Sequence, residues 1–269
     1  MRVVALLTVR NEDLYIERCL RHLHDQGVET CVIDNDSTDR TRSIVEAFVG
    51  RGVVRIERLP YKGYFDLVAQ CQQQEQLASE LDADWFLRQD ADEIREAPEG
   101  WGSLRSAIQR ADAEGFNAID FAEFVFLPIT DTIPSAFDYV NELCYYYYFQ
   151  PNPLHRVNAW KKTSAPVNIV DSGGHRVGFE GRRTLPKQFV LRHYIGLSRT
   201  HLLEKYISRV YSEIEVRDRG WHRLRHSWRN GHMVLPDLDQ LKRLEAGSRH
   251  FDKSAPHSTH LFRIEAEEK

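Results

Sequence analysis

Short apolar runs alternate with longer stretches of helical periodicity through the first third of the chain. The run at 3–7 is too short for a helix and predicts a buried strand, and further strands are predicted at 30–33, at 53–56 and from Trp85. Between the first two, residues 12–26 place apolar side chains at helical spacing. This alternation predicts an α/β fold, a Rossmann-like, mostly parallel sheet with helices on both faces.

Polar segments stand where the predicted strands end, at 8–12, at 34–39 and at the run that begins with Asp90. Because ligands of open α/β sheets bind beyond the carboxyl ends of the strands, we expect the three segments to form one site. Asp90, Asp92 and Glu93 are crowded at one strand end and repel one another unless a positive charge lies among them. A divalent cation that prefers oxygen ligands is the simplest candidate, and a solvated acidic turn is the alternative.

Composition limits the class of protein. The formal net charge of -4 and a pI near 6.3 give no electrostatic footprint for wrapping duplex nucleic acid. The four cysteines show no Cys-x-x-Cys spacing, which argues against a zinc knuckle or a disulfide framework and suits a reducing compartment. The apolar start at 1–7 is too short for a signal peptide or a spanning helix. We therefore expect a cytoplasmic protein.

The second half of the chain has a weaker pattern. Residues 118–126 and 143–149 have the composition of strands, and irregular, proline-containing sequence lies between them. Over 201–216, apolar side chains recur at helical spacing, which predicts a helical C-terminal tail that packs back on the body.

The three polar segments read Thr8-Val9-Arg10-Asn11-Glu12, Asp34-Asn35-Asp36-Ser37-Thr38-Asp39 and Asp90-Ala91-Asp92. In this order, each after a predicted strand, they resemble the motifs of family 2 glycosyltransferases of the GT-A fold, the Asp-x-Asp type. The resemblance implies a nucleotide-sugar-binding half at 1–126, an acceptor-binding half at 127–200 and a helical tail at 201–269 packed on the same domain.

The resemblance implies a nucleotide-diphosphate sugar donor whose diphosphate the Asp-x-Asp pair holds through Mn2+ or Mg2+. A hard cation that bridges the diphosphate oxygens stabilises the charge that develops on the leaving group. By its place in the motif, Asp92 is implied as the principal metal ligand and Asp90 as its supporter, at the ribose or a metal-bound water. Glu93 lies outside the matching pair, and capping of a helix explains it as well as metal contact does.

Further residues around the nucleotide follow from the same motifs. The resemblance implies nucleotide contacts by Thr8, Arg10, Asn11, Glu12, Asp34, Asp36 and Asp90. Capping of the helix that follows is the alternative role for Asp36 and Asp39. Lys62 and Arg88 are candidates for neutralising phosphates or carboxylates, with a solvated surface charge as the alternative for each.

Sugar transfer with inversion needs a group that accepts the proton of the acceptor hydroxyl. The Glu-Asp pair usual in the family is not evident, and retention of configuration stays open. Asp171 is the first candidate, because the glycines of the turn at 171–175 let the backbone approach a substrate closely. An ordinary turn-forming carboxylate is the alternative, and Glu142 and Asp138 are the fallback candidates.

A late histidine often supplies a third metal ligand in enzymes of the GT-A fold. His193 follows an apolar strand, and imidazole can join the Asp92 carboxylate around Mn2+. His175 competes for this role, and a purely structural histidine is the alternative for both.

A basic, aromatic stretch lies near the C-terminus. It contains Arg217, Arg219, Trp221, Arg223, Arg225, Trp228 and Arg229. An anionic acceptor, a membrane surface or single-stranded nucleic acid could meet such a stretch, and a solvated helix face explains it too. We expect no nucleic-acid partner and keep peripheral membrane contact open.

The sequence therefore predicts a metal-dependent glycosyltransferase that acts, with inversion, on a carbohydrate or glycoconjugate acceptor. Biosynthesis of cell-surface polysaccharide at the cytoplasmic face of the membrane is the expected setting. A sugar-phosphate nucleotidyltransferase is one alternative, but it needs a glycine-rich loop after the first strand, and residues 8–12 contain no glycine. A catalytically silent nucleotide-sugar or glycan binding module is the other.

Overall fold

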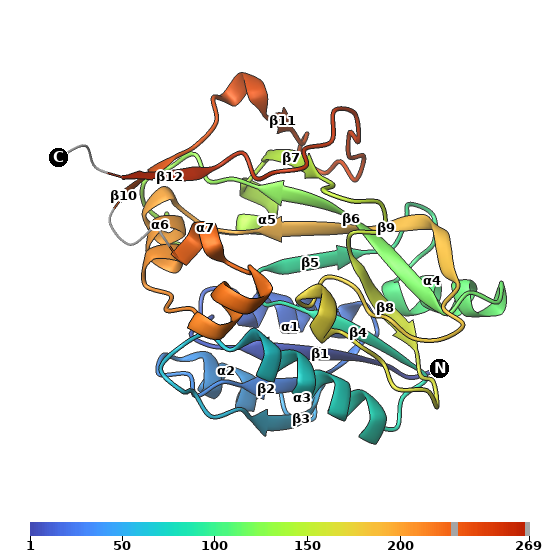
Figure 1. Cartoon of the computed structure of the whole chain (residues 1–269). Helices are drawn as coiled ribbons and strands as arrows, with labels where there is room; N and C mark the ends of the chain where they lie inside the picture. The colour runs from blue at the N-terminus through green and yellow to red at the C-terminus, as the bar shows by residue number, and fades with distance from the viewer. Residues whose placement is uncertain (227–230, 267–269) are drawn as a thin grey trace. The chain divides into compact units, whose positions relative to one another are not determined.

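The computed structural model describes residues 1–226 and 231–266, which form two compact units (Figure 1). The first unit comprises Met1–Tyr61, Leu67–Ala122 and Leu154–Leu191. The second comprises Lys62–Asp66, Glu123–Pro153 and the described residues from Arg192 onward. These units do not follow the expected boundaries after 126 and 200, because the chain passes repeatedly from one unit to the other.

Four parallel strands form the centre of the first unit, in the order β4-β1-β2-β3. They are β1 (Val3–Val9), β2 (Glu29–Asp34), β3 (Val53–Arg58) and β4 (Trp85–Gln89). Nearly every residue of β1, β2 and β4 is buried, as expected for parallel strands covered on both faces. The predicted α/β class and the four predicted strands are confirmed.

Antiparallel strands extend this arrangement, so the sheet is mixed. β8 (Val157–Lys161) pairs with β4, and the first residues of β6 (Ala118–Phe126) pair with β8. β5 (Glu93–Glu96) pairs with β9 (Thr184–Tyr194). The sequence did not predict β5 or β8, because buried charged and amide side chains interrupt their apolar pattern.

Helices cover both faces of the parallel strands, as predicted (Figure 1). α1 (Ile16–Asp25) and α2 (Thr41–Ala47) contact each other on one face, and α3 (Leu67–Glu80) lies on the other. α4 (Leu104–Ala113) completes the helices of this unit. α1 begins after the expected residue 12, since the Glu12 carbonyl accepts two backbone N–H groups and forms a turn ahead of the helix.

The described part of the second unit is built on antiparallel pairs. β6 pairs with β7 (Tyr145–Phe149) and β7 with β11 (Lys242–Arg243), while β10 (Gly231–Val234) pairs with β12 (Arg263–Ala266). Its helices are α5 (Tyr139–Glu142), α6 (Arg199–Ile207) and α7 (Arg223–His226). The hydrophobic core includes Val125, Tyr147, Leu202, Tyr206 and Phe262.

The predicted helical tail is helical only in parts: among the described residues after 200, α6 runs to Ile207, the π-helix η2 spans Glu215–Arg219, α7 spans Arg223–His226 and the 3₁₀-helix η3 spans Leu238–Gln240. α6 ends at Ile207, and the Phe65 backbone N–H then bonds to the Val210 carbonyl at 2.7 Å. This bridge pulls the chain into an extended conformation, so a tertiary pairing overrides the helical spacing of the side chains. Within the described ranges, no helix has the length and apolar composition needed to cross a bilayer.

Candidate active site

The carboxyl ends of three neighbouring strands bring the three polar segments together in the first unit. β1 lies between β2 and β4, with Val9 paired to Asp34 and Leu7 to Gln89. The segments that follow these residues therefore leave the sheet at the same edge. The predicted convergence is confirmed.

Arg10 folds the first segment onto the second. Its guanidinium lies 3.4 Å from the centroid of the Tyr61 ring and donates hydrogen bonds to the carbonyls of Asn35, at 2.7 Å, and Asp36. A planar cation stacked on an aromatic ring is held rigidly. Arg10 thus fixes the backbone of the second segment in addition to any ligand contact.

The Asp36 carboxylate is held by protein donors. It accepts hydrogen bonds from Arg58 Nε at 2.6 Å and from the Tyr61 N–H at 3.0 Å. These bonds, that of Arg58 first, lower the pKa of Asp36 to about 2. The residue does not cap α2; instead Asp39 accepts the N–H of Thr41, the first helical residue, at 2.9 Å. The capping role is confirmed for Asp39 only.

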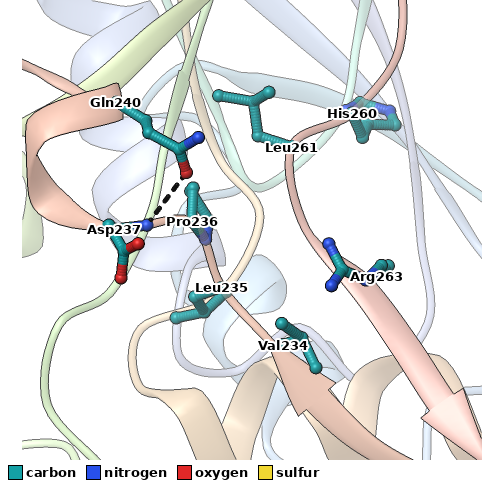
Figure 2. A pocket seen from close by; sticks show the side chains of 8 residues that line it. All are labelled: Val234, Leu235, Pro236, Asp237, Gln240, His260, Leu261 and Arg263. Carbon is teal, nitrogen blue, oxygen red and sulfur yellow. Dashed lines mark hydrogen bonds between the residues drawn. The ribbon is translucent and has the colours of Figure 1, made fainter.

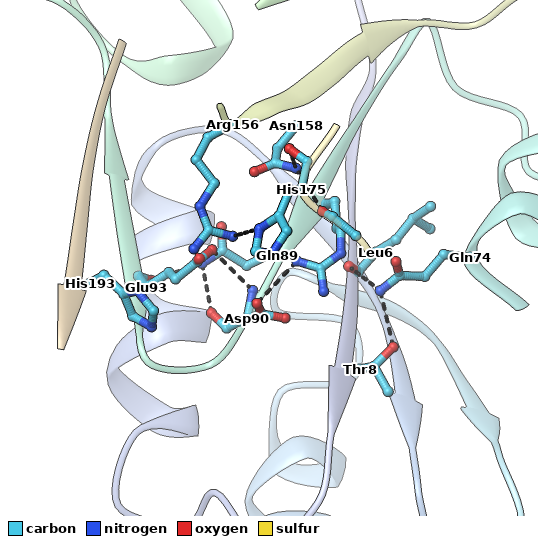
Figure 3. A network of polar contacts seen from close by, with 12 residues as sticks. Leu6, Thr8, Gln74, Gln89, Asp90, Glu93, Arg156, Asn158, His175 and His193 are labelled. Atoms are coloured by element: carbon cyan, nitrogen blue, oxygen red, sulfur yellow. Dashed lines mark hydrogen bonds and ion pairs between the residues drawn. The ribbon is translucent and has the colours of Figure 1, made fainter. Parts of the chain in front are cut away.

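Other residues of these two segments bond to one another or to nearby side chains. The Thr8 hydroxyl accepts a hydrogen bond from Gln74 at 3.1 Å, as Figure 3 shows, and Asn11 Oδ1 accepts the Thr38 N–H at 2.8 Å. The Glu12 N–H donates to the Thr41 hydroxyl at 2.7 Å. Asp34 is only 6% exposed, and its Oδ1 accepts the Ser37 N–H at 3.1 Å. Their contacts with a nucleotide stay predictions.

Arg88 is paired with the first aspartate of the Asp-x-Asp motif. Its Nη1 lies 3.0 Å from Asp90 Oδ2, and the arginine is 6% exposed, so its interpretation as a solvated surface charge is wrong. Burial opposes ionisation of Asp90, but the guanidinium groups of Arg88 and Arg156 together outweigh it, and the pKa of Asp90 is lowered. Lys62, in contrast, forms an ion pair with Asp66 at 3.1 Å and is exposed, which agrees with its alternative role as a surface charge.

Glu93 neither caps a helix nor faces an open site. It begins β5, is fully buried, and forms an ion pair with buried Arg95 at 2.5 Å. Arg95 also donates to Gln89 Oε1 and to Asn158 Oδ1, each at 3.1 Å. One of the three crowded carboxylates is therefore neutralised inside the protein, and Asp90 and Asp92 remain at the strand end.

Asn158 connects β5, the strand that follows the Asp-x-Asp turn, to a turn far along the chain. Its Oδ1 accepts from Arg95, and its Nδ2 donates to the carbonyls of Gly174 and His175, at 3.1 Å each. Figure 3 shows Asn158 beside His175. A buried side chain that bonds both to β5 and to the turn at 174–175 holds the two in one geometry. The sequence did not single out Asn158, because a lone asparagine within a strand carries no motif.

Arg156 fixes the protonation of His175. Arg156 Nη1 lies 2.8 Å from His175 Nδ1, and guanidinium can only donate, so Nδ1 accepts. Figure 3 shows this contact, and we infer from it a neutral imidazole with its hydrogen on Nε2. A metal ligand needs a lone pair, and this tautomer has none to offer beyond the one that Arg156 uses. The geometry argues against His175 as the metal ligand.

Gly174 makes room for Arg88. With φ at +82°, a Cβ here would lie 2.8 Å from the Arg88 guanidinium. We expect Gly174→Ala to lower the free energy of unfolding by about 1–3 kcal/mol more than Gly181→Ala does. Gly181 has a similar φ of +73° and no neighbour within 4 Å, so it shares the backbone strain without the clash. Urea unfolding of both variants measures the difference, and equal losses would contradict the steric role of Gly174.

The proposed bases bond within their own turns. Asp171 is exposed, and Asp171 Oδ2 accepts from Asn168 Nδ2 at 2.8 Å while its own N–H donates to Asn168 Oδ1 at 2.9 Å. In the second unit, Asp138 accepts from Asn141 at 2.7 Å, and Glu142 accepts the Asp138 N–H at 2.8 Å. The catalytic role of Asp171 stays a prediction.

His193, in the second unit, has a carboxylate partner. Its Nδ1 lies 2.7 Å from Oε1 of Glu123, which is 1% exposed. Such a contact orients an imidazole and sets its tautomer. The role of His193 as a metal ligand stays a prediction.

The side chains fit a metal site that takes some of its ligands from the substrate, and not one made by the protein alone. Among the described residues, no group of three or more histidine, cysteine, aspartate or glutamate side chains is arranged to hold a metal. Asp90 gives one oxygen to Arg88. A hard divalent cation takes six or more oxygen ligands, so Asp92 and Asp90 would need the diphosphate and water to complete the shell.

A pocket of about 420 Å³ opens in the second unit (Figure 2). Its lining includes Val234, Leu235 and Leu261 with Asp237 and Arg263, and Asp237 is bonded through its N–H to Gln240 at 3.1 Å. No residue that the sequence singled out lines it.

Several solved structures resemble the chain at low identity. The S. aureus TarS 1-349 fragment is 13% identical with a TM-score of 0.45, covering 72% of this chain and 60% of that one. The mannosyltransferase PcManGT from Pyrobaculum calidifontis, in complex with GDP-Man and Mn2+, is 18% identical with a TM-score of 0.35 over 45% of this chain and 35% of its own. The chain thus spans less than two thirds of the TarS fragment. No curated protein matches it.

A family model covers the part of the chain that contains all three polar segments. Residues 5–116 match the model described as glycosyl transferase family 2. The match begins in β1 and extends beyond β5, so it includes the whole Asp-x-Asp turn. The predicted resemblance is confirmed over this range, where the chain is similar to glycosyl transferase family 2.

Proposed function

We propose that this chain is a glycosyltransferase that moves a sugar from a nucleotide-diphosphate sugar to a hydroxyl of a carbohydrate or glycoconjugate acceptor. The observation that supports it best is the family match over residues 5–116, which contains three polar segments at the carboxyl ends of adjacent strands. This edge of an open α/β sheet is where ligands bind.

In the proposed mechanism, Asp92, supported by Asp90, would hold Mn2+ or Mg2+ together with the diphosphate. Such a metal would supply positive charge that offsets the negative charge of the departing nucleoside diphosphate. Arg88 keeps Asp90 ionised and in a fixed position. Thr8, Arg10, Asn11, Glu12, Asp34 and Asp36 form the nucleotide side of the proposed site.

Asp171 is the proposed general base. As the acceptor oxygen bonds to the anomeric carbon, the bond from that carbon to the phosphate oxygen breaks, and the hydroxyl proton passes to the Asp171 carboxylate. Attack from the face opposite the leaving group inverts the configuration. The Asp171 carboxylate is exposed and accepts a hydrogen bond from Asn168 Nδ2, and an ionised carboxylate can also accept a proton.

Substitution of Asp171 tests this role. We expect Asp171→Asn to lower kcat by about 10²–10⁴-fold, the usual contribution of general base catalysis, with little change in donor affinity. Asn168→Ala removes the bonded neighbour but keeps the carboxylate, and should retain most activity. Steady-state kinetics with calorimetry for donor binding separates the two quantities. Equal loss of both, or no loss, would place the base elsewhere.

We propose that the protein acts at the cytoplasmic side of the membrane, in the biosynthesis of cell-surface polysaccharide. The four cysteines, none of them in a disulfide, support a reducing compartment.

Calorimetric titration of the purified protein with UDP-, GDP- and TDP-sugars, with and without Mn2+, tests the proposed function. We expect one donor class to bind and Mn2+ to strengthen its binding. Absence of metal-enhanced binding by all of them would overturn the proposal of a metal-dependent transferase. Release of the nucleoside diphosphate in the presence of acceptor distinguishes an enzyme from a silent binding module.

A further inference from the structure

Exposed aliphatic side chains are concentrated in one short segment of the second unit. Nine large apolar side chains are exposed among the described residues, and three of them, Ile207, Val210 and Ile214, lie within eight positions of one another. Ile214 is 65% exposed, the highest value of the nine. The other six are scattered along the sequence. Exposing such side chains to water has a free-energy cost that neither folding nor the proposed chemistry explains.

The fold holds this segment with its aliphatic side chains outward. Tyr206 and Tyr211, which alternate with them, are 6% and 2% exposed. The bond from the Phe65 N–H to the Val210 carbonyl, and the bridge between Phe65 and Tyr211, fix the backbone here. Because Tyr211 packs inward against Phe65, with ring centroids 6.1 Å apart, its neighbour Val210 stays at the surface.

Positive charge follows the aliphatic side chains directly. Residues 207–225 contain five arginines and three acidic residues, a local excess in a chain whose net charge is -4. One of the three acids, Glu215, is buried. Arg223 donates to the Val216 carbonyl at 3.2 Å, and Arg219 lies 4.8 Å from the Trp221 ring centroid, so guanidinium groups and an indole are held at the turn that ends the segment. Trp228 and Arg229 lie outside the described residues.

We propose that residues 207–225 form a docking surface for an anionic lipid bilayer. Ile207, Val210 and Ile214 enter the boundary between headgroups and acyl chains, and the arginines lie among the lipid phosphates. Aliphatic side chains beside arginines and tryptophan are the composition of interfacial segments, and each basic residue near an anionic surface adds to the attraction. A second copy of the chain fits less well, because a two-fold contact would place the same arginines against one another.

Sedimentation with vesicles tests the proposal on the full chain. We expect binding to vesicles of phosphatidylcholine and phosphatidylglycerol in equal parts, little binding to phosphatidylcholine alone, and a decrease as salt rises. The triple variant Ile207→Ser, Val210→Ser, Ile214→Ser should lower the partition coefficient by about tenfold or more, since three aliphatic side chains no longer leave water. The matched control Leu14→Ser, Val49→Ser, Val54→Ser removes three exposed aliphatic side chains of the first unit and should bind as the parent does.

A second variant tests the arginines by themselves, so that the result does not depend on whether the triple serine variant folds. Arg217→Gln with Arg219→Gln retains the aliphatic side chains and should weaken binding only to the anionic vesicles. No binding to anionic vesicles, equal binding by the triple serine variant, or equal binding to both vesicle types would each overturn the proposal. So would a concentration-dependent dimer in light scattering that the triple variant abolishes, because the surface would then belong to a second copy.

Discussion

Asp92→Ala is expected to lower the rate of sugar transfer by about 10²–10³-fold or more, the loss that follows removal of a principal group that stabilises charge in a transition state. Asp90 is paired with Arg88 and Glu93 with Arg95, and Asp92, which follows β4, is the proposed principal metal ligand. Removing it should therefore weaken the hold on the cation directly. The measurements are kcat with saturating donor and Mn2+ affinity by calorimetry in the presence of the nucleoside diphosphate.

Asp90→Asn is the informative comparison. This change leaves Arg88, which is 6% exposed, without its carboxylate, so we expect a loss of stability as well as of activity. Asp92→Ala should leave the melting temperature close to that of the parent. Full activity in the Asp92 variant would remove the metal assignment, and a large loss of stability there would give Asp92 a structural role instead.

The second large effect is expected at the buried pair of Glu93 and Arg95. Glu93→Gln leaves the Arg95 guanidinium fully buried without a compensating charge and should lower the free energy of unfolding by about 3–5 kcal/mol. Removing both charges with Glu93→Leu and Arg95→Met should cost less than the single change. The double variant should still be less stable than the parent, because Gln89 and Asn158 then lose the donor that they share.

Urea unfolding, followed by tryptophan fluorescence, measures both variants. Trp85 and Trp160 are buried in paired strands of the first unit and report on it. If Glu93→Gln unfolds at the urea concentration of the parent, the pair contributes nothing. A double variant less stable than the single one would mean that the hydrogen bonds of Arg95 outweigh its charge.

The parallel strands could be predicted because each one is a short apolar run that can be recognised from its own residues. Apolar runs such as 3–7 end in polar residues, and adjacent parallel strands necessarily end at one edge. The Asp-x-Asp turn was found for the same reason. What it contacts could not be predicted, since Asn158 and Gly174 lie far along the chain and single-sequence patterns give no contacts between distant residues.

Buried charge also concealed local structure. β5 contains Glu93 and Arg95, which look like solvent-exposed residues until each is seen to neutralise the other. Helical spacing over 201–216 gave the opposite error at the interruption between α6 and η2, because a single pairing partner, Phe65, fixes the backbone at Val210 in another conformation. In both cases a distant or opposite-charged partner, and not local propensity, decided the outcome.

The order of strands in the first unit has a consequence for the chain as it is synthesised. β4 lies between β1, made earlier, and β8, which begins about 70 residues after β4 ends. Until Val157–Lys161 leave the ribosome, one edge of β4 has no partner, and an open edge with apolar side chains is a template for aggregation. A chain cut after residue 126 keeps that edge open permanently, so the family-matching segment is not a fragment suited to expression by itself.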